Sequence, residues 1–149
     1  TDTLYMPAIS GVRGSPYHCN MAASWIALED GDKDAGLLQY YPGSHKIPPF
    51  YFSRGQLAAD PSEFQNYKDY MAEEIDKRNL KPTTFKARKG DVLIWHELLY
   101  HGGSEIVDEK KTRKSLVTHY FRTSDVPELH RQRYGRGFYL NREPHSAPP

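Results

Sequence analysis

Two histidines and two glycines mark one apolar segment of the chain. The run KGDVLIWHELLYHGGS at residues 89–104 carries His96, and His101 follows five residues later. Imidazole is a common metal ligand and a proton carrier near neutral pH. Gly102 and Gly103 follow His101 directly, and glycine lets backbone and small molecules approach closely. A single histidine taken alone is usually structural, but this segment raises the odds that its histidines belong to a functional site.

Arg113 adds a cation at the start of the next predicted strand. It stands twelve residues after His101, and strand alternation puts it on the same face as Ser115. A guanidinium that points into a β-barrel is costly unless an anion meets it, and its planar fork suits a carboxylate. A solvated basic turn is the alternative, because three lysines lie within three residues of Arg113.

Strands must position these side chains, because most of the chain alternates short apolar runs with turns. We expect strands over residues 18–29, 37–41, 83–87, 91–95 and 115–121. Glycine-containing turns separate several of them, and the run Pro42-Gly43-Ser44-His45 is the tightest. The pattern is typical of an all-β sandwich or barrel.

One amphipathic helix is predicted among the strands, over residues 61–79. Asp60 can cap it, Pro61 suits its first position, and Glu63 would close a capping box. Four apolar residues recur at helical spacing on one face: Phe64, Tyr67, Met71 and Ile75. We expect an inserted helix that packs this face against the barrel.

Composition excludes several classes of protein. The 149 residues carry 20 basic and 19 acidic side chains, so no global basic field exists to hold nucleic acid. The single cysteine, Cys19, excludes an internal disulfide framework and a cysteine-rich zinc site. No apolar run reaches the roughly 18 residues of a membrane span, and no secretory leader is recognisable. We therefore expect a cytoplasmic globular protein.

Six short motifs extend the pattern around His101. In chain order they are WIALED at 25–30, AGL at 35–37, YPGSHK at 41–46, KGD at 89–91, HGG at 101–103 and RKS at 113–115. Together they resemble the phytanoyl-CoA dioxygenase family of non-haem iron, 2-oxoglutarate-dependent oxygenases, over residues 1 to about 123. The resemblance implies a mainly β fold, the double-stranded β-helix or jelly roll also used by cupins. It implies Fe(II) and 2-oxoglutarate as cofactors.

The resemblance also implies roles for individual residues. Asp2 and His101 match the aspartate and the distal histidine of an iron-binding two-histidine, one-carboxylate triad, which leaves coordination positions open. Arg113 matches the arginine that clamps the far carboxylate of 2-oxoglutarate. Trp25 matches an aromatic residue that lines the cofactor pocket, and Ser104 is a weaker candidate for a hydrogen bond to the cofactor.

The first histidine of the triad is expected two residues before Asp2, just off the start of this sequence. We therefore expect an N-terminally truncated chain or an incomplete metal site. His18 and Asn20 have similar spacing, but an amide lacks the charge of a carboxylate. His96 with Glu97 is another substitute, although neighbouring residues in a strand point to opposite faces and make a poor chelate.

The sequence predicts an oxygenase domain over residues 1–125 and an extended or disordered tail, rich in Arg, Gly and Pro, over residues 126–149. The predicted function is hydroxylation of a small organic substrate, without nucleic-acid or membrane partners. Two alternatives are a cupin-like metal-binding or isomerase module and a non-catalytic jelly-roll remnant. A bare barrel edge would favour a homo-oligomer.

Overall fold

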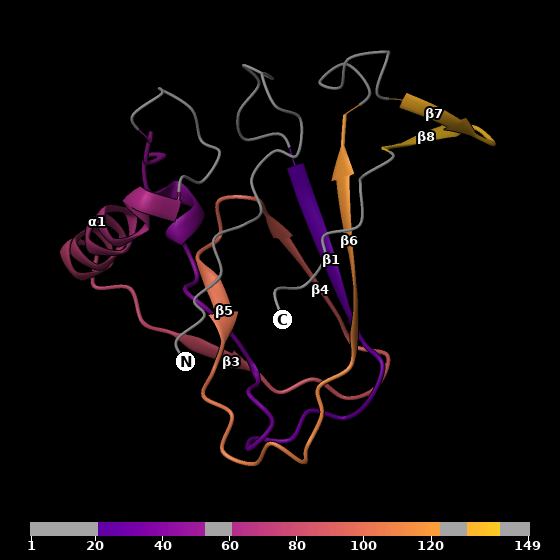
Figure 1. The fold of residues 1–149 in the computed structure, drawn as a ribbon, viewed down its shortest axis with the longest axis horizontal. Coiled ribbons are helices and arrows are strands. Elements are labelled where there is room, and N and C mark those ends of the chain that lie inside the picture. Colours follow the sequence, from indigo (N-terminus) through magenta and orange to yellow (C-terminus); the bar gives the residue numbers. More distant parts are fainter. Residues whose placement is uncertain (1–20, 53–60, 123–130, 141–149) are drawn as a thin grey trace.

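Strands dominate the part of the chain that the computed structural model describes, residues 21–52, 61–122 and 131–140 (Figure 1). Six strands form the body of the fold: β1 (Met21–Ala27), β2 (Leu38–Tyr40), β3 (Thr83–Phe85), β4 (Val92–His96), β5 (His101–Gly103) and β6 (Ser115–Phe121). The predicted mainly β class with one inserted helix is confirmed.

The six strands form two antiparallel sheets of three strands each. β1 lies between β4 and β6 in one sheet, and β2 lies between β3 and β5 in the other. From β3 onward, each connection crosses from one sheet to the other, as does the connection from β1 to β2 (Figure 1). Chain winding between two antiparallel sheets is the arrangement of a jelly roll.

Alternation along β1 builds the core between the two sheets. Ala23, Trp25 and Ala27 are buried on one face of β1. They pack with Trp95 of β4 and with Leu38 of the opposite sheet. Burial of a large apolar side chain such as these contributes roughly 1.5–3 kcal/mol, so this cluster holds the two sheets together.

The opposite face of the β4-β1-β6 sheet carries exposed apolar side chains. They are Val92, Ile94, Leu116 and Tyr120. Their alternation with the buried positions follows from the period of two along each strand. The predicted homo-oligomer stays a prediction.

The inserted helix begins later than the sequence predicted. Pro61–Glu63 form a 3-10 turn, and α1 spans Phe64–Lys77. Glu63 is the N-cap itself and makes no side-chain capping hydrogen bond, whereas the predicted capping box joins Glu63 to Asp60 and stays a prediction. Asp60 lies outside the described residues. No helix in the described ranges is long and apolar enough to cross a membrane.

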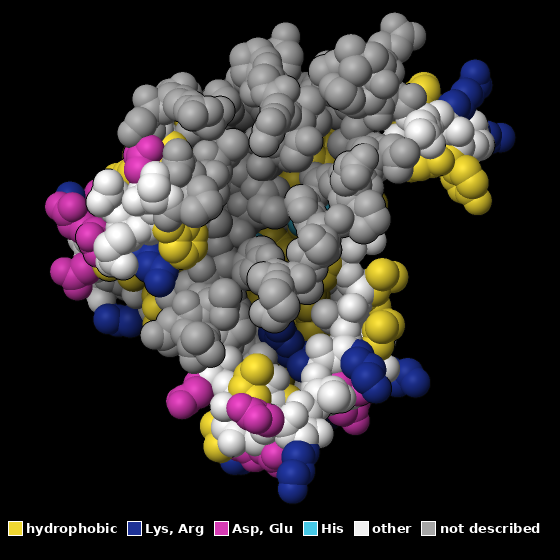
Figure 2. All heavy atoms as spheres, in the orientation of Figure 1, with side chains coloured by type: hydrophobic (Ala, Val, Ile, Leu, Met, Phe, Trp, Pro, Cys, Tyr) yellow, Lys and Arg dark blue, Asp and Glu magenta, His cyan; other side chains and the backbone are white. Residues whose placement is uncertain are grey.

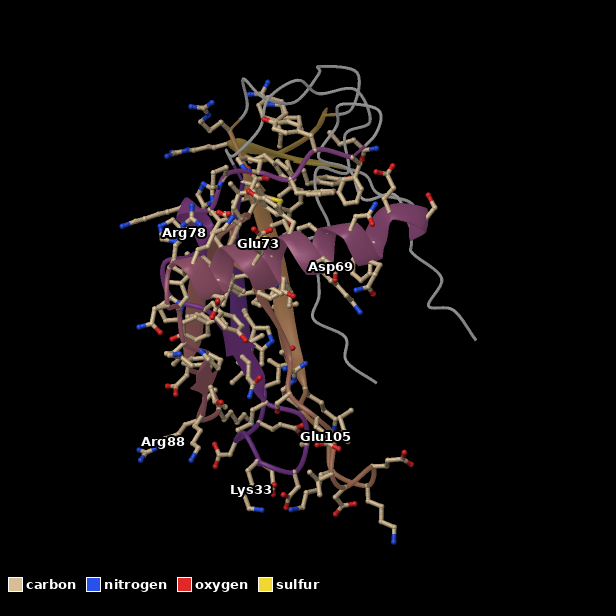
Figure 3. All side chains as sticks on the ribbon, turned by 90° about the vertical axis from the view of Figure 1, so that its left-hand side faces the viewer. Lys33, Asp69, Glu73, Arg78, Arg88 and Glu105 are labelled. Atoms are coloured by element: carbon tan, nitrogen blue, oxygen red, sulfur yellow. The ribbon has the colours of Figure 1, made fainter. Side chains whose placement is uncertain are left out.

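The predicted apolar face of α1 is the face that packs. Tyr67 and Met71 are buried in a second cluster, completed by Ile47, Phe52 and Tyr100. Glu73 pairs with Lys77 at 2.7 Å on the outer side, and Arg78 pairs with Glu74 one position further along (Figure 3). Exposed pairs of this kind contribute little to stability, so the aromatic cluster fixes the helix.

The C-terminal segment contains a β-hairpin. β7 (Arg131–Tyr134) and β8 (Gly137–Leu140) pair antiparallel, and Gly135 in the connection has a φ of +57°. The sequence predicted an extended or disordered segment here, because its Arg, Gly and Pro content outweighed the strand alternation. A glycine at positive φ is what a tight hairpin turn requires. The predicted boundary near residue 126 lies outside the described residues.

Gly36 lies where the β1–β2 loop meets the chain after β5. Its φ is +73°, and an added Cβ would lie 2.9 Å from the carbonyl oxygen of Ser104. We expect Gly36→Ala to lower the free energy of unfolding by about 3 kcal/mol, because left-handed strain and the backbone clash add. Gly90→Ala is the control. Its φ is +93° with nothing within 4 Å, so strain alone predicts a loss of about 1 kcal/mol. Urea unfolding measures both, and equal losses would contradict the clash.

Candidate active site

His101 opens β5 and lies against the opposite sheet. Its ring centroid is 4.9 Å from that of Trp95, a member of the core cluster. Burial lowers the pKa of His101, and a hydrogen bond to Leu99 opposes part of this effect. A lowered pKa favours the neutral imidazole, which is the form that binds metal ions.

The backbone carbonyl of Leu99 determines which ring nitrogen of His101 is unprotonated. Nδ1 lies 2.7 Å from the carbonyl oxygen of Leu99. A carbonyl only accepts hydrogen bonds, so Nδ1 carries the proton and the neutral ring presents an unprotonated Nε2. Metal-binding histidines are commonly held in this way by a second group. No sequence pattern marks this partner, because every residue has a carbonyl.

The PGSH turn supports the backbone just before His101. The 3-10 turn Ser44–Lys46 follows Gly43, whose φ is +89°. Ser44 is buried, and its Oγ accepts a hydrogen bond of 2.8 Å from the backbone N–H of Tyr100. The N–H of Tyr41 donates to the carbonyl of Tyr100 at 3.0 Å. The turn therefore positions β5, a role that the sequence indicated only as a structural turn.

Arg113 brings a partly buried cation into the protein. Its Nη1 is buried and has no hydrogen-bond partner among the described residues. Burial lowers the pKa of Arg113, and no carboxylate in the described part of the chain opposes that effect. Because a guanidinium stays charged in proteins, an unpaired buried one is costly. The chemistry that would relieve this cost is an anion, and a carboxylate matches the fork of the guanidinium.

The guanidinium lies on the same face of β5 as the imidazole. A Cβ added to Gly103 would lie 3.9 Å from Nη2 of Arg113. His101 and Gly103 are two residues apart, so they face the same side of the sheet, about 7 Å apart along the strand. A metal-binding group and an anion-binding group therefore lie side by side between the sheets.

Trp25 lies between these two groups along β1. On one side, β1 pairs at Ala23 with Trp95, whose ring contacts the imidazole. On the other side, β1 pairs at Ala27 with Ser115, two residues after the arginine. The Trp25 ring is buried on the same face, so it forms part of the apolar wall between the groups. Its contact with a cofactor stays a prediction.

Several predicted site residues are not brought to this place by the described structure. Asp2, His18 and Asn20 lie outside the described residues. Within the described ranges, no group of three or more His, Cys, Asp or Glu side chains could hold a metal ion. The backbone N–H of Ser104 donates to the carbonyl of Leu37 at 2.7 Å. The predicted hydrogen bond from Ser104 to the cofactor stays a prediction.

His96 is the last residue of β4, and Glu97 follows it in a turn. Glu97 is buried, and its Oε1 accepts a hydrogen bond of 3.4 Å from the N–H of Met21. The His96 ring lies 6.0 Å from that of His45, and its Nδ1 accepts from the N–H of Leu98 at 3.2 Å. The structure gives no support to this alternative pair.

Comparison with known proteins gives a family match. Residues 4–115 match the family described as phytanoyl-CoA dioxygenase (PhyH). No curated protein matches the chain. Similar solved structures include the epimerase SnoN in complex with Fe3+, alpha ketoglutarate and nogalamycin RO, at 22% identity over 83% of this chain and 46% of that chain, with a TM-score of 0.45. The non-heme alpha ketoglutarate dependent carbocyclase SnoK is 20% identical over 66% of this chain and 34% of that chain, with a TM-score of 0.42. The chain spans less than half the length of either structure.

Proposed function

The chain belongs to the phytanoyl-CoA dioxygenase family, and on that premise we propose that it serves Fe(II)- and 2-oxoglutarate-dependent oxidation of a small organic substrate. The observation that carries the proposal is the buried Nη1 of Arg113, which has no hydrogen-bond partner among the residues that the structure describes and whose guanidinium lies on the His101 face of β5. A metal-only module or an inert jelly roll has no need of a buried cation there.

Different residues of the chain would bind Fe(II) and 2-oxoglutarate. His101 would hold Fe(II) through Nε2, while the Leu99 carbonyl keeps the proton on Nδ1. Asp2 is the proposed carboxylate ligand. Arg113 would hold the far carboxylate of 2-oxoglutarate through charge-assisted hydrogen bonds. Bound Fe(II) and 2-oxoglutarate supply, with O₂, the oxidising power that protein side chains lack.

The apolar wall around these groups strengthens the binding. Trp25 and Trp95 are both buried next to the site, and an environment poor in water increases the attraction between the guanidinium and a carboxylate. The same wall protects a reactive oxidant from water. We propose Trp25 and Ser104 as residues that contact the cofactor.

Hydroxylation of the substrate is the reaction that we propose. Epimerase and carbocyclase are the activities named for two of the similar structures. Product mass distinguishes the three outcomes. Hydroxylation adds one oxygen atom, epimerisation leaves the mass unchanged, and oxidative ring closure removes two hydrogen atoms.

An anaerobic titration tests the cofactor assignment directly. The 149-residue chain is loaded with Fe(II), and 2-oxoglutarate is then added while the weak metal-to-ligand charge-transfer band is followed in the visible. We expect a band that needs both components, and conversion of 2-oxoglutarate to succinate when O₂ is admitted. Glu73→Ala, a change on the outer side of α1, is the control and should leave the band unchanged.

Two other results of this titration would overturn the proposal. Fe(II) binding that 2-oxoglutarate does not perturb would favour a cupin-like metal module. Absence of Fe(II) binding, even when the expected first histidine of the triad is supplied ahead of Asp2, would favour a non-catalytic jelly roll. In both cases no succinate would form.

A further inference from the structure

Two hydrogen bonds to one carboxylate flank Arg113. Glu29 lies two residues beyond the end of β1, and its Oε1 accepts from the Thr112 hydroxyl at 2.7 Å and from the Lys114 backbone N–H at 2.7 Å. The backbone N–H of Leu28 donates to the Lys114 carbonyl at 3.0 Å. Both chain neighbours of the arginine are therefore fixed to the end of β1.

We propose that Glu29 is the positioning residue for Arg113, acting through Thr112 and Lys114 to aim the guanidinium at the carboxylate of 2-oxoglutarate. This inference rests on the proposed function. Glu29 itself touches neither cofactor nor substrate, so its effect passes through the backbone on either side of the arginine.

The need for such a residue follows from where Arg113 lies. Arg113 lies two residues before β6 begins at Ser115, so the strand pairing of β6 does not restrain the backbone of Arg113 itself. A clamp works only when its donors are held within about 0.5 Å of the productive geometry. The Glu29 carboxylate supplies that restraint at residues 112 and 114. The hydrogen bond from the Thr112 hydroxyl and, to a lesser extent, the one from the Lys114 N–H lower the pKa of Glu29. Its carboxylate is therefore ionised at neutral pH and can accept both hydrogen bonds.

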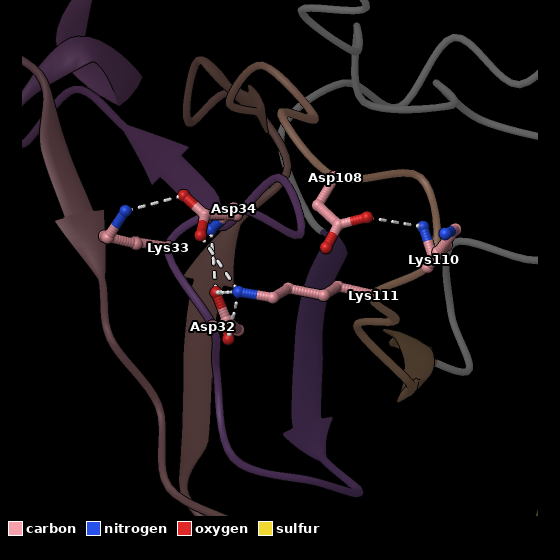
Figure 4. Close-up of polar contacts among 6 residues, drawn as sticks. All are labelled: Asp32, Lys33, Asp34, Asp108, Lys110 and Lys111. Carbon is pink, nitrogen blue, oxygen red and sulfur yellow. Dashed lines mark hydrogen bonds and ion pairs between the residues drawn. The ribbon is translucent and has the colours of Figure 1, made fainter.

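A second set of contacts ties the same two loops together without flanking the arginine. Lys111 Nζ lies 2.9 Å from a carboxylate oxygen of Asp32 and 2.9 Å from one of Asp34 (Figure 4). Charged side chains gather at this end of the molecule, over the loops that join β1 to β2 and β5 to β6 (Figure 2). Figure 3 shows Lys33 and Glu105 there, away from α1.

This exposed network serves as the comparison for Glu29. Exposed ion pairs are screened by solvent and contribute little. Lys111→Met removes the network but keeps both hydrogen bonds to Glu29. It should therefore leave the 2-oxoglutarate affinity within about twofold of the unaltered chain.

Four substitutions test the proposal through the affinity of the Fe(II)-loaded chain for 2-oxoglutarate, measured by anaerobic calorimetry. Glu29→Ala should weaken it about tenfold, and Thr112→Val by less, because one of two hydrogen bonds remains. Glu29→Gln keeps an oxygen acceptor and should restore most of the affinity. Lys114→Ala keeps its backbone N–H, loses only a 3.9 Å ion pair, and should have no effect.

Two further readouts separate positioning from loss of structure. Fe(II) affinity and the thermal midpoint should change little in Thr112→Val, whereas the KM for 2-oxoglutarate rises and kcat holds. Thr112→Val added to Glu29→Ala should cause no further loss, because both remove the same contact.

The outcomes distinguish this inference from the proposed function. Full 2-oxoglutarate affinity in Glu29→Ala, alongside its loss in Arg113→Ala, overturns the positioning role alone. An equal loss in Lys111→Met also overturns it, because general anchoring of the loop would then explain the effect. Failure of the unaltered chain to bind 2-oxoglutarate overturns the proposed function instead.

Discussion

Arg113→Ala is expected to abolish 2-oxoglutarate binding while Fe(II) binding and the fold persist. Truncating one partner of a buried, hydrogen-bonded charge pair costs about 2–5 kcal/mol, so the affinity should fall by about a hundredfold or more. The ligand-free chain, in contrast, should become more stable. Nη1 has no partner among the described residues, so its removal relieves an unpaired charge and should raise the free energy of unfolding by up to about 1 kcal/mol.

Calorimetry with 2-oxoglutarate and urea unfolding of the ligand-free chain measure these two effects. Arg113→Lys is the matched variant, because it keeps the charge but loses the planar fork, and it should bind with intermediate affinity. Equal losses of Fe(II) and 2-oxoglutarate binding in Arg113→Ala would count against a clamp. A large loss of stability would show that the guanidinium is already paired.

His101→Ala is expected to remove Fe(II) binding. The substitution deletes the Nε2 that the Leu99 hydrogen bond leaves free, and Asp2 and His101 are the two metal ligands proposed for this chain. We expect the affinity to fall by about a hundredfold or more, since loss of a direct ligand should exceed the 10–100-fold effect of losing a supporting group. Anaerobic equilibrium dialysis with Fe(II) measures it.

His96→Ala is the control for this prediction. The His96 ring lies 6.0 Å from that of His45, and its Nδ1 accepts a hydrogen bond from the N–H of Leu98, so its removal should leave Fe(II) binding unchanged. The reverse pattern, loss in His96→Ala and retention in His101→Ala, would move the metal site to His96. Circular dichroism of both variants identifies any loss of fold.

The sequence predicted most of the strands because their signals are local. The expected strand over residues 115–121 matches β6, Ser115–Phe121, and the expected strand over 18–29 contains β1. β5 is only three residues long and contains two glycines, so no strand pattern marks it. The start of α1 was predicted too early because capping residues do not distinguish a 3-10 turn from an α-helix.

The site was predicted less completely because its supporting contacts span long distances in the chain. His101 and Arg113 were predicted as site residues from the HGG and RKS motifs, and the structure places the guanidinium on the His101 face of β5. The Glu29 carboxylate reaches a backbone N–H 85 residues away. Such a pairing has no periodicity, so only the register of β1 with β6 brings it about.

The Leu99 carbonyl has a consequence for how this protein can diverge. Every amino acid carries that carbonyl, so substitution at position 99 cannot delete the acceptor that sets the His101 tautomer. The Leu99 side chain lies in the core cluster, and its N–H donates to the His96 carbonyl. Apolar residues other than proline can therefore replace Leu99 in descendant sequences. The path of the backbone, and not the side chain at position 99, keeps the proton on Nδ1 of His101.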